Sequence, residues 1–219
     1  HLASKKYKPG CSFETEIRLE EVAGLVPVRV SRIGDVPRAQ FTAPVVPFAV
    51  DVAPPTAEEI AKAVGLSADD VGFGDHRPGV FQGGPRFLFV PLASREALAR
   101  ARPLEPYWSA VLKPLGCQMA YLYAAGGDDP KTAYRARMFA PETGTFEDPA
   151  TGSATAILAA QLLSAERPTD GTHRWQLEQG HEMGRPSDLG LEADVAGAKL
   201  AAVRVAGQAV QIMSGVLEP

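Results

Sequence analysis

Acidic, hydroxyl-bearing and glycine residues come together in one segment, FEDPATGSATAILAAQLL, which spans residues 146–163. Two adjacent carboxylates, Glu147 and Asp148, lie near its start, and the proline that follows them restricts the backbone. The second part, residues 154–163, consists mainly of good helix formers and is predicted to be a helix. We expect the chemistry of this protein at the junction between the polar turn and the helix.

Thr151, Gly152 and Ser153 lie where the predicted helix starts. The first backbone N–H groups of a helix have no partner within the helix, and the helix dipole adds partial positive charge there, so this position suits an anion. The same residue types also serve ordinary N-capping, in which the hydroxyl of Ser153 or Thr151 accepts a hydrogen bond from the next turn. Spacing alone leaves an anion site and a simple cap equally open.

The helix predicted at residues 154–163 has almost no polar face. A helix that is apolar all round is buried, so we expect its N-terminus to lie in the protein interior. A buried helix end needs hydrogen-bonding partners, and a ligand is one such partner. This favours a binding site over a cap.

The composition is that of a globular protein: 219 residues, of which 45% are hydrophobic and 22% charged. This is enough for one large domain or two small ones. The formal net charge of -4 and the lack of a Lys/Arg cluster argue against a nucleic-acid partner. No apolar run is long enough to span a bilayer and no signal-peptide pattern opens the chain, so we expect no membrane partner and predict a cytoplasmic protein.

The two cysteines, Cys11 and Cys117, lie far apart and show no CxxC or Cys/His spacing. They are predicted to be reduced, structural thiols rather than zinc ligands or a disulfide. His173 and His181 have no partner at a spacing typical of metal ligands and are predicted to be isolated. The sequence therefore indicates neither a metal site nor a cofactor.

An acid–histidine pair, Asp75 and His76, lies on a loop rich in glycine and proline. Adjacent side chains on a loop point in different directions, and no serine or cysteine stands in a nucleophile elbow, so a surface loop is predicted rather than a catalytic dyad. Arg185 lies between a glycine and a proline and is predicted to fix a turn or form a surface pair rather than bind an anion. The sequence GGDDPKT lacks the ending of a phosphate-binding loop, so nucleotide binding is not expected.

Alternating apolar and polar residues predict three antiparallel strands in the first part of the chain, and a proline-rich break places a domain boundary near residue 50. The next stretch predicts a helix with Thr56 and Glu59 in capping-box spacing and Gly65 at its end. The three strands are expected at residues 13–19, 26–30 and 38–43.

The second part of the chain predicts a curled antiparallel sheet around the apolar helix. Strands are expected at residues 83–92, 118–124, 134–140, 174–180, 190–195, 201–207 and 209–215, and short helices at residues 94–101 and 107–113.

The stretch RMFAPETGTFEDPATGSATAILAAQLL, residues 137–163, resembles the second-domain motif of PhzF-like proteins, the phenazine-biosynthesis isomerase family. GGPRFLFVPL and QGHEMGRPS resemble further family segments in order and spacing, so the resemblance runs from about Phe13 to the end. It implies an α+β, two-domain fold of the diaminopimelate epimerase type, in which each domain is a curled, mainly antiparallel sheet around a central helix, with the active site between the domains. Residues 1–50 would then be a remnant of the first domain, and residues 51–219 the second domain with its linker helix.

Transferred to this sequence, the resemblance implies that Asp148 holds the substrate or helps to protonate it, while Thr151, Gly152 and Ser153 hydrogen-bond a substrate carboxylate. Backbone donors at a helix start suit a carboxylate, and a carboxyl group in a desolvated cleft can have a pKa that is useful for proton transfer. The implied activity is that of a cofactor-independent isomerase that moves a proton on a small carboxylate-bearing substrate. The implied assembly is a homodimer.

The family's principal acid/base is a glutamate in the first domain, and a Gly-His pair follows it at a helix start in the same domain. Neither of these first-domain motifs has a counterpart in this chain. We expect on the order of 80 residues of a typical domain to precede His1 in the full-length protein, and the isomerase activity is expected only with the glutamate of that segment. The alternative is a non-catalytic binding or assembly protein that keeps the cleft without the base. An amino-acid racemase of the diaminopimelate type is disfavoured, because the turn has residues Ala150 to Ser153 where that chemistry requires a cysteine.

Overall fold

The computed structural model describes residues 7, 11–22, 24–32, 36–210, 213 and 215. Its strands, as far as these residues show them, build one 12-stranded sheet. The strands are β1 (Phe13–Glu21), β2 (Gly24–Arg32), β3 (Pro37–Thr42), β4 (Phe48–Ala49), β5 (Gly79–Gln82), β6 (Arg86–Pro91), β7 (Ala120–Ala125), β8 (Thr132–Ala140), β9 (Thr145–Asp148), β10 (Gly171–Gln179), β11 (Ser187–Ala196) and β12 (Lys199–Gln208).

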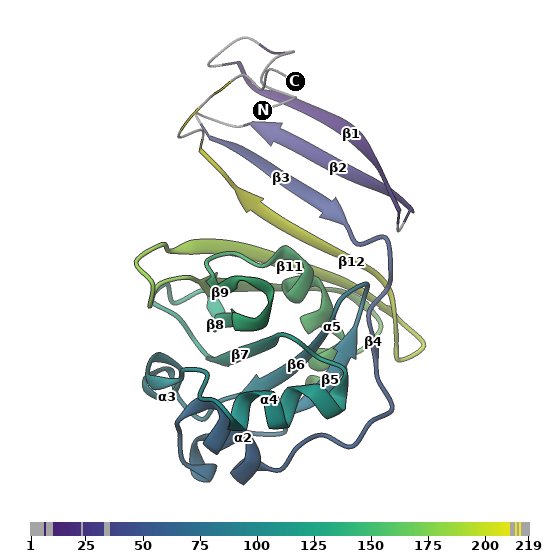
Figure 1. Ribbon diagram of the computed structural model, residues 1–219. Coiled ribbons are helices and arrows are strands. Elements are labelled where there is room, and N and C mark those ends of the chain that lie inside the picture. The colour runs from purple at the N-terminus through teal and green to yellow at the C-terminus, as the bar shows by residue number, and fades with distance from the viewer. Residues whose placement is uncertain are drawn as a thin grey trace.

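The order of strands in the sheet is β1-β2-β3-β12-β11-β10-β8-β7-β6-β5-β4, and β9 pairs with β8 off this path. Strands β1, β2 and β3 form the predicted antiparallel meander, and β3 pairs with β12 from the other end of the chain. Most neighbours are antiparallel, but β6 and β7 run parallel, as do β8 and β10. The first part of the chain is therefore joined to the second through β12 (Figure 1).

Local capping defines the helix that follows the proline-rich segment, α2 (Ala57–Val64). The Thr56 side chain accepts from Glu59 N–H, the Glu59 carboxylate accepts from Thr56 N–H at 2.8 Å, and Gly65 ends the helix at a φ of 69°. The predicted capping box and stop are confirmed. In the described part of the chain the other helices are α3 (Arg95–Arg100), α4 (Tyr107–Leu112) and α5 (Gly152–Glu166), with short 3-10 helices η1 (Ala68–Asp70), η2 (Lys113–Leu115) and η3 (Pro141–Thr143).

Helices cover both faces of the central strands, with α5 on one side and α2, α3 and α4 on the other (Figure 1). Strand β6 shows the division: Phe87 and Phe89 pack in the cluster around α5, whereas Leu88 and Val90 pack in the cluster with the other helices. Strands that are covered on both faces are apolar throughout. Residues 154–162 of α5 are all buried, which confirms the expected burial of this helix on every side.

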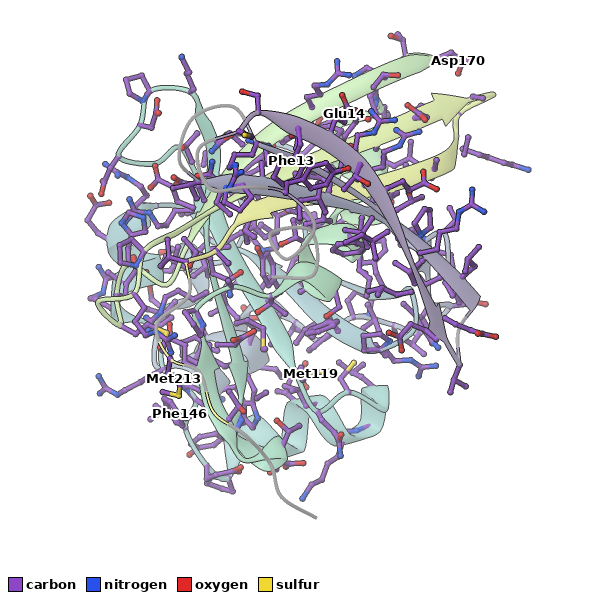
Figure 2. All side chains as sticks on the ribbon, turned by 90° about the horizontal axis from the view of Figure 1, so that it is seen from above. Phe13, Glu14, Met119, Phe146, Asp170 and Met213 are labelled. Atoms are coloured by element: carbon purple, nitrogen blue, oxygen red, sulfur yellow. The ribbon has the colours of Figure 1, made fainter. Side chains whose placement is uncertain are left out.

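Strand β1 has one mainly apolar and one charged face. Phe13 and Ile17 of β1 lie on the apolar face, and Glu14 and Glu16 alternate with them on the other face. Figure 2 labels Phe13 and Glu14 on this strand. The two glutamates are exposed, as expected for a solvated face.

The α+β class and the sheet around a central helix confirm the predicted fold. Every strand predicted between residues 13 and 207 overlaps an observed strand. The last predicted strand, residues 209–215, is not observed at the positions that the structure describes, namely 209, 210, 213 and 215. The other residues of this predicted strand lie outside the described part. Strands β4, β5 and β9 were not predicted, because two to four residues are too few to show a period.

The domain boundary near residue 50 stays a prediction. In the part of the chain that the structure describes, no helix combines the length and the apolar character needed to cross a membrane.

Candidate active site

Strand β9 delivers the acidic pair to the start of helix α5. It pairs with β8, which places Glu147 opposite Phe139 and Asp148 opposite Met138. Because side chains alternate along a strand, the two adjacent carboxylates point to opposite sides. The strand therefore gives them different environments.

Glu147 forms a buried ion pair with Arg137 of β8. The two oxygens of Glu147 accept hydrogen bonds from Nε and Nη2 of Arg137 at 2.8 and 2.9 Å, and both side chains are 9% exposed. Nη1 of Arg137 donates to the carbonyl groups of residues 98, 99 and 101 at the end of α3. Both charges are compensated, so Glu147 has a structural role.

Asp148 contacts the first residues of the helix instead. The Thr151 hydroxyl donates to Asp148 Oδ2 at 2.7 Å. Thr151 is the N-cap residue of α5, yet among the described residues its side chain makes no cap hydrogen bond. The structure thus contradicts the simple capping interpretation, because the hydroxyl binds Asp148 and leaves the first N–H groups of the helix without a side-chain cap.

A buried glutamine at the end of β10, Gln179, holds both ends of this turn. Its Nε2 donates to the carbonyl of Asp148 at 2.7 Å and to Thr151 Oγ1 at 2.9 Å, and its Oε1 accepts from Thr151 N–H at 3.2 Å. The motifs in the sequence do not point to a role for Gln179. A weak signal was its place at the start of the segment QGHEMGRPS, but nothing local shows that this side chain reaches the turn.

Gly152 and Ser153 form the first turn of α5. Gly152 is half-buried and Ser153 is exposed, whereas Thr151 is buried. The expectation that the helix start lies wholly in the interior is therefore wrong for the described structure, although the helix body is buried. A Cβ atom added to Gly152 would lie 3.3 Å from Cε1 of Phe41, so the glycine allows the turn to approach β3 closely.

The segment after Gln179 packs against the same turn. Gly180 has a φ of +78°, and an added Cβ would lie 2.3 Å from the carbonyl oxygen of Arg185 and 2.8 Å from that of Pro149. The N–H of Arg185 donates to the carbonyl of Gly180 at 2.8 Å. The main chain at Arg185 thus forms a turn, while the role predicted for its exposed side chain stays a prediction.

Asp75 and His76 do not form a dyad, but the predicted surface loop is wrong for His76. Asp75 is exposed, whereas His76 is only 7% exposed. The Nδ1 atom of His76 lies 2.9 Å from the Tyr123 hydroxyl, and its ring stacks on Phe73 at 4.3 Å between centroids. Burial lowers the pKa of His76, which favours the neutral ring.

Cys117 is buried and Cys11 is exposed, and both are free thiols. Burial raises the pKa of Cys117 to about 11. At neutral pH this thiol stays protonated and is a poor nucleophile. The environment of Cys117 agrees with the predicted structural role and disfavours two-cysteine racemisation.

Asp128, Glu178 and His181 lie close together, with one potential metal-ligating atom of each within 4.8 Å of the others. The expectation that His181 is isolated is therefore wrong. Arg135 forms ion pairs with Asp128 at 2.8 Å and with Glu178, so its guanidinium compensates this cluster. Burial by itself would raise the pKa of Glu178, but hydrogen bonds from two backbone N–H groups, the Thr132 hydroxyl and Arg135 lower it to about 2.

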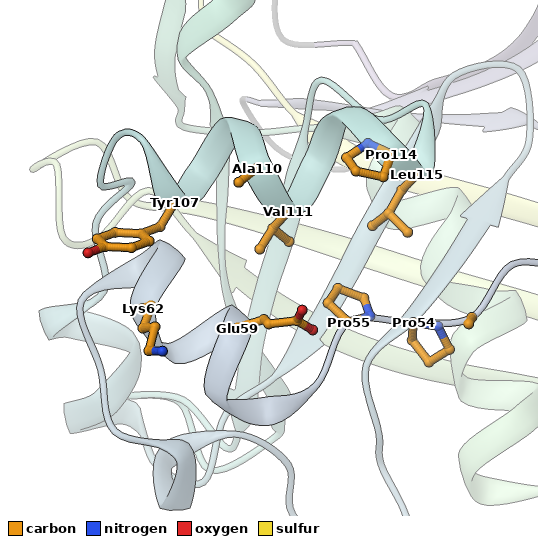
Figure 3. Close-up of a pocket in the computed structure, with 10 residues that line it drawn as sticks. Pro54, Pro55, Glu59, Lys62, Tyr107, Ala110, Val111, Pro114 and Leu115 are labelled. Atoms are coloured by element: carbon orange, nitrogen blue, oxygen red, sulfur yellow. The ribbon is translucent and has the colours of Figure 1, made fainter.

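A groove of about 420 Å³ lies between α2 and α4 (Figure 3). Its walls are mostly apolar, and the carboxylate of Glu59 within it is engaged in the capping box. None of its lining residues belongs to segment 145–166, so the groove is separate from the acidic turn. It is lined by Ala53, Pro54, Pro55, Glu59, Lys62, Tyr107, Ala110, Val111, Pro114 and Leu115.

The turn between β9 and α5 brings the four predicted site residues together, namely Asp148, Thr151, Gly152 and Ser153. It combines a carboxylate held by a hydroxyl with backbone N–H groups at a helix start. Such a carboxylate can exchange a proton with a bound molecule, and such N–H groups bind anions.

A profile of the family described as phenazine biosynthesis-like protein, PhzC-PhzF, matches residues 3–215. An uncharacterised isomerase of Mesorhizobium japonicum is 38% identical over 204 residues, which are 91% of this chain and 67% of the relative. A trans-2,3-dihydro-3-hydroxyanthranilate isomerase of Pseudomonas aeruginosa is 34% identical over 136 residues, which are 62% of this chain and 46% of the relative.

Two solved structures share the fold. The phenazine biosynthesis protein of the PhzF family from Bacillus anthracis has a TM-score of 0.79 at 21% identity, over 94% of this chain and 68% of its own. A predicted epimerase from Pseudomonas aeruginosa has a TM-score of 0.68 at 30% identity, over 94% of this chain and 69% of its own. In these comparisons the chain spans at most 69% of a relative's length.

Proposed function

The chain belongs to the PhzC-PhzF family of phenazine biosynthesis-like proteins, and we propose that it is a cofactor-independent isomerase that moves a proton on a small carboxylate-bearing substrate. Relatives are isomerases by name, and one is named for trans-2,3-dihydro-3-hydroxyanthranilate, a cyclic amino acid. The substrate class proposed for this chain is a cyclic or amino-acid-like carboxylate.

One observation carries the proposal: the Thr151 hydroxyl donates to Asp148 instead of capping α5. The turn therefore presents an oriented carboxylate beside uncapped N–H groups. In the proposed mechanism the N–H groups of Gly152 and Ser153 bind the substrate carboxylate, and Asp148 takes or gives a proton at a nearby carbon. The proton removed from one carbon is replaced at another, so the isomerisation needs no oxidant, reductant or cofactor.

A second candidate is a binding or assembly protein that holds a carboxylate without turning it over. The exposure of Ser153 favours it, because proton transfer benefits from a site that excludes water. The two candidates differ in whether carbon-bound hydrogen exchanges with solvent.

Deuterium exchange tests the proposal. The protein is incubated in D₂O with a panel of cyclic and amino-acid carboxylates that includes trans-2,3-dihydro-3-hydroxyanthranilate, and mass spectrometry follows deuterium incorporation. We expect one carboxylate to gain carbon-bound deuterium. Asp148→Asn should lower the rate by about a hundredfold to ten-thousandfold, the usual contribution of a positioned acid/base. Asp69→Asn on the exposed helix η1 is the matched control and should exchange at the wild-type rate.

A wild-type rate in Asp148→Asn would remove Asp148 from the mechanism. The binding protein would be established by two results together. No carboxylate of the panel gains carbon-bound deuterium, and benzoate, added as a simple carboxylate probe, shifts the Gly152 and Ser153 amide signals in NMR spectra. The homodimer and the cytoplasmic location also remain our proposals, and light scattering after size-exclusion chromatography checks the dimer.

A further inference from the structure

A buried glutamine determines the direction of the hydrogen bonds in the candidate active site. We propose that Gln179 is a positioning residue, which acts through the Thr151 hydroxyl to hold the Asp148 carboxylate in one orientation. Its effect on turnover rests on the proposed function, whereas the hydrogen-bond relay can be tested without a substrate.

Two main-chain groups fix the orientation of the Gln179 amide. The N–H of Thr151 can only donate and lies 3.2 Å from Oε1, while the carbonyl of Asp148 can only accept and lies 2.7 Å from Nε2. The Tyr121 hydroxyl donates to the same Oε1 at 3.4 Å, and burial raises the pKa of Tyr121, so this phenol keeps its proton. A flipped amide would place donor against donor and acceptor against acceptor at these contacts.

The fixed amide sets the direction of the Thr151 hydroxyl in turn. The second N–H of Gln179 Nε2 donates to Thr151 Oγ1 at 2.9 Å, so this oxygen acts as an acceptor. A hydroxyl has one proton, and the proton of Thr151 is directed to Asp148 Oδ2, 2.7 Å away. The relay therefore runs in one direction, from Gln179 through Thr151 to Asp148.

Gln179 and Thr151, the first two members of the relay, are shielded from water, and Asp148 is half-buried. Gln179 is 0% exposed and Thr151 is 6% exposed. The Thr155 hydroxyl also donates to the carbonyl of Thr151 at 2.9 Å, which anchors the backbone at this point. Hydrogen bonds are stronger in such low-dielectric surroundings, and an unpaired group is more costly there. Within the described part of the chain, Oδ1 of Asp148 receives no hydrogen bond, so this oxygen is left for the substrate.

The kinetic experiment compares kcat and KM for deuterium exchange in Gln179→Glu, Thr151→Val and the double variant. Glutamate replaces the donor Nε2 by an acceptor of the same shape, and valine replaces the hydroxyl by a methyl group. Each single variant should lose about tenfold to a hundredfold in kcat, because a hydrogen bond to a charged group is lost or reversed.

The kinetic pattern separates positioning from a purely structural role. KM should stay within about twofold of the wild-type value, because the groups that bind the substrate carboxylate are unchanged. The double variant should be no slower than the slower single variant, because both changes act through one hydroxyl. Thr151→Ser should restore kcat. Gln176→Glu is the matched control, since it lies on the opposite face of β10 and should behave as wild type.

The substrate-free experiment follows the two side-chain amide protons of Gln179 by NMR. Both should exchange slowly with solvent in the wild type and in Asp148→Asn, which keeps the main-chain carbonyl and Thr151 Oγ1 as acceptors. One proton should exchange faster in Thr151→Val.

Fast exchange of both amide protons in the wild type would overturn the relay. Wild-type kcat in Gln179→Glu, or a loss in the double variant equal to the product of the single losses, would overturn the positioning role. If the wild-type protein shows no turnover, the proposed function alone is refuted. The exchange rates of the Gln179 amide protons would still show whether the relay exists.

Discussion

Replacing Glu178 by glutamine should destabilise the protein at neutral pH and much less in acid. The side chain of Glu178 is 3% exposed and accepts hydrogen bonds from the N–H groups of Asp128 and Asp129 at 2.9 to 3.0 Å, and from the Thr132 hydroxyl at 2.8 Å. Arg135 donates to it as well. Glutamine has the same shape but no charge, and its NH₂ group would face these donors.

The magnitude follows from the pKa of Glu178, which falls from 4.5 to about 2 in the folded protein. At about 1.4 kcal/mol for each pKa unit between these values, the ionised carboxylate contributes at most about 3–4 kcal/mol. Solvent reaches the neighbouring Asp128, whose side chain is 65% exposed, and screens the charges of this cluster. We therefore expect the ionised Glu178 carboxylate to contribute about 2 kcal/mol to the free energy of unfolding. Because the folded-state pKa is the lower one, this contribution is complete above pH 4.5 and is lost as the pH falls toward 2.

Urea unfolding followed by tryptophan fluorescence measures the effect, since Trp108 is 1% exposed in the folded protein. The deficit of Glu178→Gln relative to wild type should be about 2 kcal/mol at pH 7 and less than half of that at pH 3. Glu20→Gln on the exposed part of β1 is the control and should change the free energy of unfolding little at either pH. An equal deficit at both pH values, or none at pH 7, would refute the electrostatic reasoning.

Two further substitutions test a close backbone contact and a buried ion pair at the acidic turn. Gly180→Ala should lower the free energy of unfolding by about 3 kcal/mol or more, because its Cβ would lie 2.3 Å from a carbonyl oxygen. Gly184→Ala, at a similar positive φ but with no atom of a described residue within 4 Å of the added Cβ, should cost only about 1 kcal/mol, and equal losses in thermal unfolding would contradict the clash. Glu147→Gln should cost about 3–5 kcal/mol in urea unfolding, because Arg137 would be left buried without its counter-charge. Glu16→Gln, in an exposed pair, should cost at most about 1 kcal/mol, and a similar cost for both would refute the difference.

Much of the fold could be predicted because its elements carry local signals. The capping box of Thr56 and Glu59 and the stop at Gly65 are encoded within ten residues, and the structure shows each of them. The alternation along β1 and β2 likewise predicted two strands, and both are present. The order of the strands could not be predicted, because the pairing of β3 with β12 joins residues from opposite ends of the chain.

The candidate site was predicted only in part, for the same reason. Asp148, Thr151, Gly152 and Ser153 follow one another within six residues, so their types and spacing could be recognised together. Gln179 lies 28 residues beyond Thr151 and contacts it only because β10 ends beside the turn. The buried position of His76 was also missed, because its partner Tyr123 lies on a distant strand.

The sequence by itself determined where chemistry is expected, since a carboxylate, two hydroxyls and a glycine before an apolar helix are local features. Spacing alone left an anion site and a simple cap by Ser153 or Thr151 equally open, because both uses require the same residues at the same spacing. Only the tertiary structure shows that the Thr151 hydroxyl binds Asp148 and does not cap the helix. The fold brings the buried amide of Gln179 against Thr151, and this contact directs the hydroxyl of Thr151 to Asp148.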